Sequence, residues 1–220
     1  MSHNRKLSRQ SNECMIEQFN LDGVRFLYGT RITIPPDIWV GLGAFRYKVF
    51  SEKLGWKLPD ALHSEKLEYD VYDGERSIHI VALDSDGSIC GCSRLISTED
   101  LYMLNSTFRA LLTDAAPETP FIWELSRVAI QNSRGRSVSA SLFCKIIAAS
   151  LLTARTHGAR LVIGVVSESM ERLYRRAGFA LTRIGPPTLH DGEVILACSM
   201  HARMEEQHPY HLDGYPRQVD

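Results

Sequence analysis

The chain has 220 residues, of which 44% are hydrophobic and 23% charged, a composition typical of one globular α/β domain with a sizeable core. Its 25 Lys and Arg residues nearly balance its 26 Asp and Glu residues. No overall positive field therefore favours nucleic acid or an anionic membrane, and a charged partner must be met by a local patch. We expect neither nucleic acid nor a membrane as a partner.

The cysteines and the amino terminus indicate a cytoplasmic protein. An odd number of cysteines lies mostly inside apolar segments rather than at the spacings of a disulfide framework, which indicates reduced thiols. They are Cys14, Cys90, Cys92, Cys144 and Cys198. The first residues begin basic but lack the apolar stretch that a secretion signal requires, and no run approaches the length of a membrane span.

Polar segments at both ends bound a single domain over residues 21–200. Residues 1–20 are expected to form a loose amino-terminal extension, and residues 201–220 a polar tail. The tail contains three histidines, but their pattern does not favour a metal site, and we expect no metal. These histidines are His201, His208 and His211.

The first predicted elements are a strand and a helix that brings an arginine to an apolar face. Residues 25–34 are rich in aromatic and β-branched residues, as in a strand, and two prolines stop it. A helix follows to about residue 53, with apolar residues three to four positions apart. Arg46 and Phe50 lie one turn apart beside this apolar stripe.

Residues 54–75 form an irregular stretch that is longer than most connectors in compact domains. Such long loops are usually functional or disordered. An ordered loop that covers another part of the protein is favoured by Trp56, Asp70 and Asp73. The alternative is a set of solvated acids with one anchoring Trp.

A hairpin and a short amphipathic segment come next. Residues 77–83 and 88–96 alternate as two strands across an Asp-Gly turn, and the second strand carries Arg94. Residues 102–112 then place Phe108 in the core or in the wall of a pocket.

Residues 121–130 read as an apolar strand that embeds a carboxylate, a hydroxyl and a guanidinium. Burying such groups without partners is costly, so we expect them to be used, with a structural Glu/Arg pair at a strand end as the alternative. In an uninterrupted strand Glu124 and Ser126 share one face and Arg127 points to the other. A bulge would bring Glu124 and Arg127 toward one cleft.

In the second half of the chain the sequence predicts helices over 139–157 and 167–177 and strands over 160–166, 179–184 and 193–199. This order indicates an α+β fold with a mixed central sheet flanked by helices, similar to the GNAT class of acyltransferases. Ordinary members bind the pyrophosphate of acetyl-CoA with an Arg-x-x-Gly-x-Gly/Ala loop at a helix start. The best match here, residues 136–141, has Ser where the turn needs Gly, so a CoA-dependent N-acetyltransferase is the alternative function.

A more specific resemblance rests on six motifs in a fixed order. The motifs are 45–50 with 54–56, 68–73, 91–95, 102–104 with Phe108, 123–127 and 169–178. Over residues 30–200 the chain resembles the LuxI-type acyl-homoserine lactone synthases, which produce quorum-sensing signals (autoinducers). The invariant positions of that family are all present: Arg46, Phe50, Trp56, Asp70, Asp73, Arg94, Phe108, Glu124 and Arg127.

The resemblance implies an acyltransferase reaction. The amine of S-adenosylmethionine attacks the acyl thioester of acyl carrier protein, and the methionine carboxylate then displaces methylthioadenosine to close a lactone. No cofactor is implied, because S-adenosylmethionine is a substrate. The amine must lose a proton near neutral pH, which suits a carboxylate as general base. Glu124 is the first choice for this base and Asp70 the second, and Arg127 completes the expected catalytic set.

The resemblance also implies a substrate site. The residues expected to bind S-adenosylmethionine are Arg46, Phe50, Trp56, Asp70, Asp73, Arg94, Phe108 and Arg127. The two aspartates are expected to hold the ammonium and sulfonium charges, while Arg46 and Arg127 pair with the carboxylate and fix the acids. Phe50 and Trp56 would close over the adenosyl group, with a cation–π contribution to the sulfonium.

The acyl chain is expected to lie in a tunnel beside the central strand, although the same residues also suit plain core. They are Leu125, Phe143, Ile147, Leu151, Val166, Met170 and Leu173. In the family a Thr just before the helix at Ser167 accompanies 3-oxo chains. Val166 occupies that position here, which favours an unsubstituted chain of medium length.

Acyl carrier protein is acidic, so its docking requires a local basic patch. Cations of the second half supply candidates: Arg134, Arg136, Lys145, Arg155, Arg160, Arg172, Arg175 and Arg176. Solvated helix faces are the alternative for about half of them. A non-catalytic effector-binding module is a further alternative to the enzyme as a whole.

Overall fold

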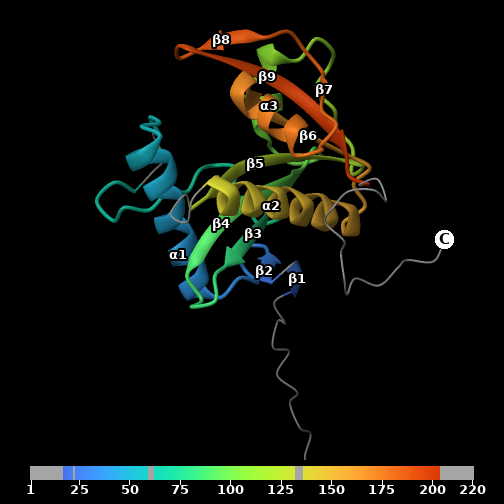
Figure 1. The fold of residues 1–220 in the computed structure, drawn as a ribbon. Coiled ribbons are helices and arrows are strands. Elements are labelled where there is room, and N and C mark those ends of the chain that lie inside the picture. Colours follow the sequence, from blue (N-terminus) through green and yellow to red (C-terminus); the bar gives the residue numbers. More distant parts are fainter. Residues whose placement is uncertain (1–16, 22, 59–61, 132–135, 204–220) are drawn as a thin grey trace, which may run out of the picture.

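The fold is built on one mixed sheet, and helices pack on both of its faces (Figure 1). The structure is a computed structural model that describes residues 17–21, 23–58, 62–131 and 136–203. The strands follow the order β1-β2-β3-β4-β5-β6-β9-β7, with β8 paired to β9. The sheet is antiparallel except for β5 and β6, which run parallel. The predicted α+β arrangement is confirmed.

The predicted helices and strands occur in the order expected from the sequence. The strands are β1 (Glu17–Leu21), β2 (Val24–Gly29), β3 (Ile78–Leu83), β4 (Ile89–Ser97), β5 (Ile122–Ile130), β6 (Leu161–Ser167), β7 (Thr182–Arg183), β8 (Thr188–His190) and β9 (Glu193–His201). The helices are α1 (Pro36–Arg46), α2 (Arg136–Thr156) and α3 (Glu168–Arg176), with a π-helical segment η1 (Tyr47–Lys53) and 3₁₀ turns η2 (Met103–Asn105) and η3 (Arg109–Leu111).

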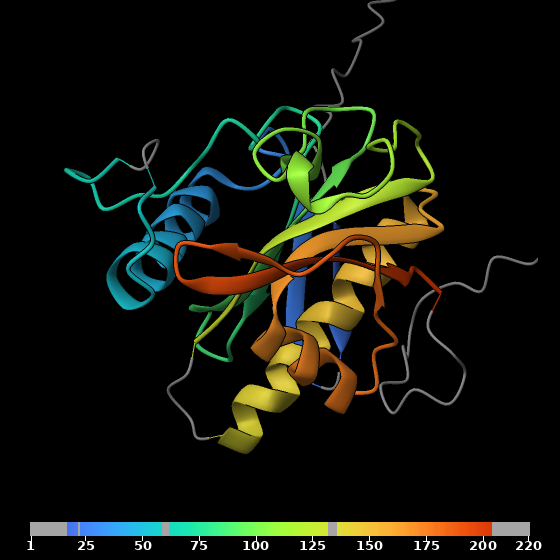
Figure 2. The same cartoon turned by 90° about the horizontal axis from the view of Figure 1, so that it is seen from above.

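Each face of the sheet has its own apolar cluster. Because side chains alternate along a strand, Ile80 and Ala82 of β3 join the cluster with α2, whereas Val81 and Leu83 join the cluster with α1. Figure 2 shows α1 on one side of the sheet and α2 with α3 on the other. Contrary to the expectation that no run approaches the length of a membrane span, residues Val138–Thr156 of α2 are long and apolar enough to cross a membrane. Of this stretch 67% is buried, as in the core helix of a globular fold.

Several predicted boundaries are wrong. The strand expected over 25–34 ends at Gly29, because the amides of Thr33 and Ile34 turn back to the carbonyl of Thr30. Glu17–Asn20 was expected in the loose extension but belongs to β1, which pairs antiparallel with β2 and stacks Phe19 on Phe26 with ring centroids 5.3 Å apart. The strand expected over 179–184 is reduced to β7, because Phe179 and Leu181 turn into the core cluster after α3 ends.

The central strand β5 opens away from β6 at the level of the charged residues. The parallel ladder between them covers only Ile122–Glu124 against Leu161–Ile163. The two backbones still approach closely at the point where the ladder ends, since a Cβ on Gly164 would lie 2.7 Å from the carbonyl oxygen of Leu125.

A bulge in β5 decides where Arg127 points. The register with β4 shifts between Cys92 and Arg94, and Arg127 has a φ of 52° in the left-handed region. Ahead of the bulge, Leu125 belongs to the cluster on the α2 face; beyond it, Ala129 belongs to the cluster on the α1 face. The bulge reverses the alternation, so Arg127 reaches the face that already carries Glu124 and Ser126. Of the two geometries considered for this strand, the bulged one is confirmed.

Candidate active site

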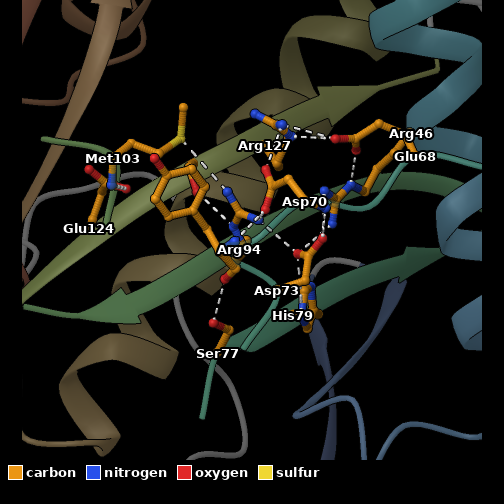
Figure 3. Close-up of polar contacts among 12 residues, drawn as sticks. Arg46, Glu68, Asp70, Asp73, Ser77, His79, Arg94, Met103, Glu124 and Arg127 are labelled. Carbon is orange, nitrogen blue, oxygen red and sulfur yellow. Dashed lines mark hydrogen bonds and ion pairs between the residues drawn. The ribbon is translucent and has the colours of Figure 1, made fainter. Parts of the chain in front are cut away.

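Six charged side chains from four parts of the chain meet over the α1 face of the sheet (Figure 3). The arginines come from the end of α1, from β4 and from β5, and the carboxylates come from the loop before β3. The residues are Arg46, Arg94, Arg127, Glu68, Asp70 and Asp73, and each side chain is at most 8% exposed. We call this set the charge ring.

Arginines and carboxylates alternate around the charge ring without a break. Arg46 Nε bonds Glu68, and Arg127 Nη2 donates to Glu68 Oε1 at 2.9 Å and to Asp70 Oδ2 at 2.6 Å. Arg94 Nη1 bonds Asp70 and also donates to Asp73 Oδ1 at 2.7 Å. Arg46 closes the circuit by donating to both oxygens of Asp73, at 2.9 and 3.1 Å.

The ring balances three positive charges with three negative ones in a buried place. Burial opposes ionisation of Asp73, yet Arg46 and Arg94 outweigh it and hold the pKa of this carboxyl well below its ordinary value. Burial also opposes the charge of Arg46, but Asp73 and Glu68 outweigh it and raise the pKa of the guanidinium. Each charge of the ring has an opposite charge on both sides, the arrangement that buried ions require.

The loop that supplies the carboxylates is held in shape by its own backbone. The amide of Asp70 donates to Asp73 Oδ2 at 2.8 Å, and the amide of Tyr72 donates to Asp70 Oδ1 at 2.9 Å. The amide of Glu68 donates to the carbonyl of Gly43 on α1 at 3.1 Å. These bonds fix the loop against α1, so the spacing of the three acids is set before any ligand arrives.

Glu124 lies on the same face but outside the charge ring. Its oxygens accept the amides of Met103 at 3.0 Å and Leu104 at 2.8 Å, and the residue is 1% exposed. Within the described residues it forms no ion pair with an arginine, and its link to the ring runs through Met103, whose sulfur accepts from Arg94 Nη2 at 3.7 Å. Burial raises the pKa of Glu124 above its ordinary value, although the two amides oppose the shift.

An aromatic wall flanks the ring on the α1 side. The guanidinium of Arg127 lies 5.4 Å from the ring centroid of Phe50, and Phe50 stacks on Trp56 with centroids 4.9 Å apart. Phe50 is carried by the π-helical segment η1, a geometry that is frequent at functional sites. Trp56 remains 47% exposed, so its indole can still receive a flat ligand.

His79 of β3 lies beneath the ring and is almost completely buried. Its Nε2 is 3.8 Å from Asp73 Oδ1, too far for a hydrogen bond, and it has no hydrogen-bond partner among the described residues. Burial lowers the pKa of His79 to about 3, despite the attraction of Asp73. The imidazole is therefore neutral near physiological pH and adds no charge to the ring.

The structure brings together most of the site residues expected from the sequence. Arg46, Asp70, Asp73, Arg94 and Arg127 form the charge ring with Glu68, and Phe50, Trp56 and Glu124 border it. Phe108 lies apart: its ring packs against His190 of β8 at 5.4 Å, within a different apolar cluster.

Two members of the site were missed in the sequence. Glu68 was noticed only as part of a motif, yet it joins Arg46 to Arg127. The charge balance could have revealed it, because the sequence predicted three arginines in the site but only two aspartates to pair with them. His79 gave no usable signal, because a single His in an apolar strand is usually a core residue.

The residues proposed for the acyl tunnel share one apolar cluster between β5, β6, α2 and α3. Leu125, Phe143, Ile147 and Leu151 are buried. Val166, Met170 and Leu173 are partly buried and pack against the same cluster. They are core residues in this structure, and their partly buried members lie around the point where α3 leaves β6.

The expected basic patch divides into separate groups. Arg172, Arg175 and Arg176 are exposed on α3, which begins where β6 ends, whereas Arg155 and Arg160 lie at the other end of β6. Lys145 lies midway along α2. Arg134 and the side chain of Arg136 lie outside the described residues.

No three His, Cys, Asp or Glu side chains within the described ranges are arranged to hold a metal ion. His208 and His211 of the tail lie outside those ranges. Cys92, Cys144 and Cys198 are buried free thiols, and Cys90 is buried with its thiol donating to the carbonyl of Ala82 at 3.4 Å.

Neutralising Glu68 should destabilise the fold, because Glu68→Gln leaves Arg46 and Arg127 buried with too little negative charge. Breaking a buried pair in this way costs about 3–5 kcal/mol. Urea unfolding should show a loss of this size, with Glu52→Gln as the matched control. Glu52 pairs with Lys66 at 3.4 Å in solvent, so its loss should change stability by less than about 1 kcal/mol. Equal effects of the two variants would contradict a coupled ring.

His79 should make stability depend on pH. Its pKa falls from 6.5 to about 3 on folding, so below pH 6.5 the unfolded chain binds a proton that the folded chain excludes. Stability is therefore full above pH 6.5 and declines as the pH falls, with a slope of up to about 1.4 kcal/mol per pH unit. Denaturant titrations from pH 7 to 5 should show this slope, and His79→Phe, which keeps a ring against Trp39, should flatten it. An unchanged slope in the variant would refute the assignment.

Comparison with known proteins gives a consistent result over most of the chain. Residues 40–209 match the family model described as autoinducer synthase. An acyl-homoserine-lactone synthase of Pseudomonas aeruginosa is 37% identical over 182 residues, which cover 80% of this chain and 88% of that protein.

Solved structures agree. TofI, crystallised in a ternary complex with an inhibitor and MTA, is similar with a TM-score of 0.71 and 38% identity, covering 80% of this chain and 91% of that chain. BjaI, a CoA-dependent acyl-homoserine lactone synthase with SAM and isopentyl-CoA, has a TM-score of 0.69 at 25% identity, covering 80% and 82% of the two chains. A Lactobacillus plantarum structure that bears the name of an N-acetyltransferase has a TM-score of 0.57 at 16% identity, a likeness of fold alone that confirms the GNAT-like architecture. The chain belongs to the autoinducer synthase family and is an acyltransferase of the acyl-homoserine-lactone synthase type.

Proposed function

We propose that the enzyme makes an N-acyl-L-homoserine lactone from S-adenosylmethionine and acyl-acyl carrier protein, releasing methylthioadenosine and holo-acyl carrier protein. S-adenosylmethionine is a substrate in this proposal, and no resident cofactor takes part. The observation that carries it is the buried charge ring with Glu124 beside it. BjaI, whose structure holds SAM, and TofI, whose structure holds MTA, support the choice of substrate.

The net charge of the site suits this substrate. The ring is neutral, and Glu124 adds one negative charge that no arginine neutralises directly within the described residues. S-adenosylmethionine carries a sulfonium, an ammonium and a carboxylate, and so has a net charge of plus one. A low-dielectric site with one excess negative charge favours such a ligand over neutral or anionic ones.

The charges of the ring alternate, so its carboxylates can pair with the cationic groups of a zwitterion and its arginines with the anionic group, in place of some of their pairs with one another. Asp70 and Asp73 face the ammonium and sulfonium. Arg46 and Arg127 each keep N–H groups that no described residue accepts from, and these can donate to the carboxylate. The open face of Trp56, stacked on Phe50, receives the adenosyl group. Arg94 holds both aspartates in place from below.

Glu124 is the better general base of the two candidates. Asp70 already accepts from Arg94 and Arg127, so a proton on it would weaken two buried ion pairs. Among the residues that the structure describes, Glu124 accepts only from two backbone amides, and burial raises its pKa above the ordinary value, a direction that suits a general base. It takes the amine proton directly or through one water. Ring closure is intramolecular, so positioning supplies much of its rate.

The acyl chain is proposed to enter between β5 and β6, where their ladder ends at Glu124. The apolar cluster beyond that point offers Leu125, Val166, Met170 and Leu173 as its lining. Val166 presents no hydroxyl to a 3-oxo group, so an unsubstituted chain of medium length is the proposed substituent.

The docking surface for acyl carrier protein is proposed on α3. Arg172, Arg175 and Arg176 are exposed on this short helix, and Glu171 holds Arg175 in place through a bond of 3.0 Å. The helix follows directly from β6 and so lies next to the proposed entrance of the acyl chain. Because BjaI is named as CoA-dependent, an acyl-CoA donor is the second candidate, and assays with each donor separate the two.

We place the reaction in the cytoplasm.

Replacing the proposed base should abolish the product while the chain stays folded. Cells that express Glu124→Gln should release at least about a hundredfold less acyl-homoserine lactone, since general-base catalysis contributes about 10²–10⁴ in rate. Mass spectrometry of medium extracts measures the lactone and reads its acyl length. Glu118→Gln, an exposed glutamate near the same segment, is the matched control and should keep full output.

Absence of any lactone from the unmodified chain, despite soluble protein and an acyl pool, would contradict the proposed function and favour an N-acetyltransferase. Full output from Glu124→Gln would leave the function intact but remove Glu124 as the base.

Docking on α3 should be sensitive to salt and to charge. The KM for acyl carrier protein should rise steeply with ionic strength, while the KM for S-adenosylmethionine barely moves, because exposed charges are screened and buried ones are not. Arg172→Glu with Arg176→Glu should raise the carrier-protein KM further and flatten its salt dependence. Arg25→Glu, exposed on β2, serves as the control. Equal salt dependence of the two KM values would contradict docking of acyl carrier protein on the basic residues of α3.

A further inference from the structure

Tyr72 belongs to the loop that carries the acids, and its two ends have different neighbours. Its backbone amide donates to Asp70 Oδ1 at 2.9 Å, and its carbonyl accepts from Ser77 Oγ at 2.7 Å. Its ring lies under Arg94, with the guanidinium carbon 5.7 Å from the centroid. At its base, Tyr72 is therefore part of the frame that holds Asp70 and Arg94.

The hydroxyl of Tyr72 reaches across to a different segment. Its oxygen is 2.8 Å from Ser106 Oγ and 2.7 Å from Thr107 Oγ1. These two residues follow η2, whose first amides are held by Glu124. Ser106 is itself fixed by a bond of 2.8 Å to the carbonyl of Tyr102. The tyrosine thus spans from the acidic loop to the segment that Glu124 anchors.

This span connects the two parts of the site that have different tasks. On one side lie Asp70 and Asp73, which the proposed function assigns to the cationic groups of the substrate. On the other lies Glu124, to which it assigns the amine proton. Within the described residues two other side-chain contacts join these segments. One is the long contact of Arg94 with the sulfur of Met103 at 3.7 Å, and the other is the ion pair of the exposed Arg76 with Asp100, which lies ahead of η2.

We propose that Tyr72 is a positioning residue, whose hydroxyl ties the acidic loop to the Glu124-anchored segment and so sets the distance between the amine-binding acids and the base. This inference rests on the proposed function, and it adds a residue that touches neither the reacting atoms nor the acyl chain. Its ring supports Arg94, and its hydroxyl supplies the tie to Ser106 and Thr107.

Tyr72→Phe removes the tie and keeps the ring. A neutral hydrogen bond contributes about 0.5–1.5 kcal/mol, so the KM and the calorimetric Kd for S-adenosylmethionine should rise about three- to tenfold. The melting temperature should fall by no more than about 5 °C, the cost of one neutral hydrogen bond in a chain of this size. The KM for the acyl donor should stay unchanged, because a general loss of folded protein would affect both substrates together. Tyr28→Phe, which removes a hydroxyl bonded to Glu17 on β1, should leave the KM and Kd values for both substrates unchanged.

A double-mutant cycle with Thr107→Val tests the tie itself. Thr107→Val should weaken S-adenosylmethionine binding in the unmodified chain and have no effect in Tyr72→Phe, because the partner is already gone. Independent, multiplying effects, or an unchanged Kd in Tyr72→Phe, would overturn the proposal. If the unmodified chain itself fails to bind S-adenosylmethionine, the proposed function falls, and the role of Tyr72 falls with it.

Discussion

Three buried guanidiniums are the constraint on which the rest of the structure depends. A buried arginine without a carboxylate is severely destabilising, and Arg46, Arg94 and Arg127 are each at most 7% exposed. The long loop before β3 has to bring Glu68, Asp70 and Asp73 over the sheet, and its backbone bonds to α1 and to its own acids hold it there. The loop is thus fixed by electrostatics where the rest of the core is fixed by apolar packing.

The bulge in β5 completes this arrangement and at the same time prepares the site for chemistry. Without it Arg127 would point into the apolar cluster under α2, and the ring would lack the arginine that joins Glu68 to Asp70. The same strand leaves β6 just beyond Glu124. One irregular strand therefore places the proposed base, an anchoring arginine and the proposed acyl entrance within a few residues of one another.

The sequence was sufficient for the order of the elements and for five of the six ring residues, because hydrophobic periodicity and the motif set are local signals. It left Glu124 and Arg127 undecided between the two faces, since only the left-handed φ at Arg127 settles the alternation. Phe108 was expected in the core or in a pocket wall, and it does pack against an apolar cluster; its contact with His190 depends on β8, far away in the chain. Glu68 and Tyr72 were overlooked because their roles lie in partners between 22 and 59 residues distant, which no spacing in the sequence reveals.

The central claim is that the charge ring and Glu124 together form the S-adenosylmethionine site. A crystal structure of the protein soaked with S-adenosylmethionine tests it most directly. The ammonium should lie at the side of Asp70 and Asp73 that faces Glu124, the carboxylate on Arg46 or Arg127, and the adenine against Trp56. Ligand bound elsewhere, with the ring contacts unchanged, would contradict it.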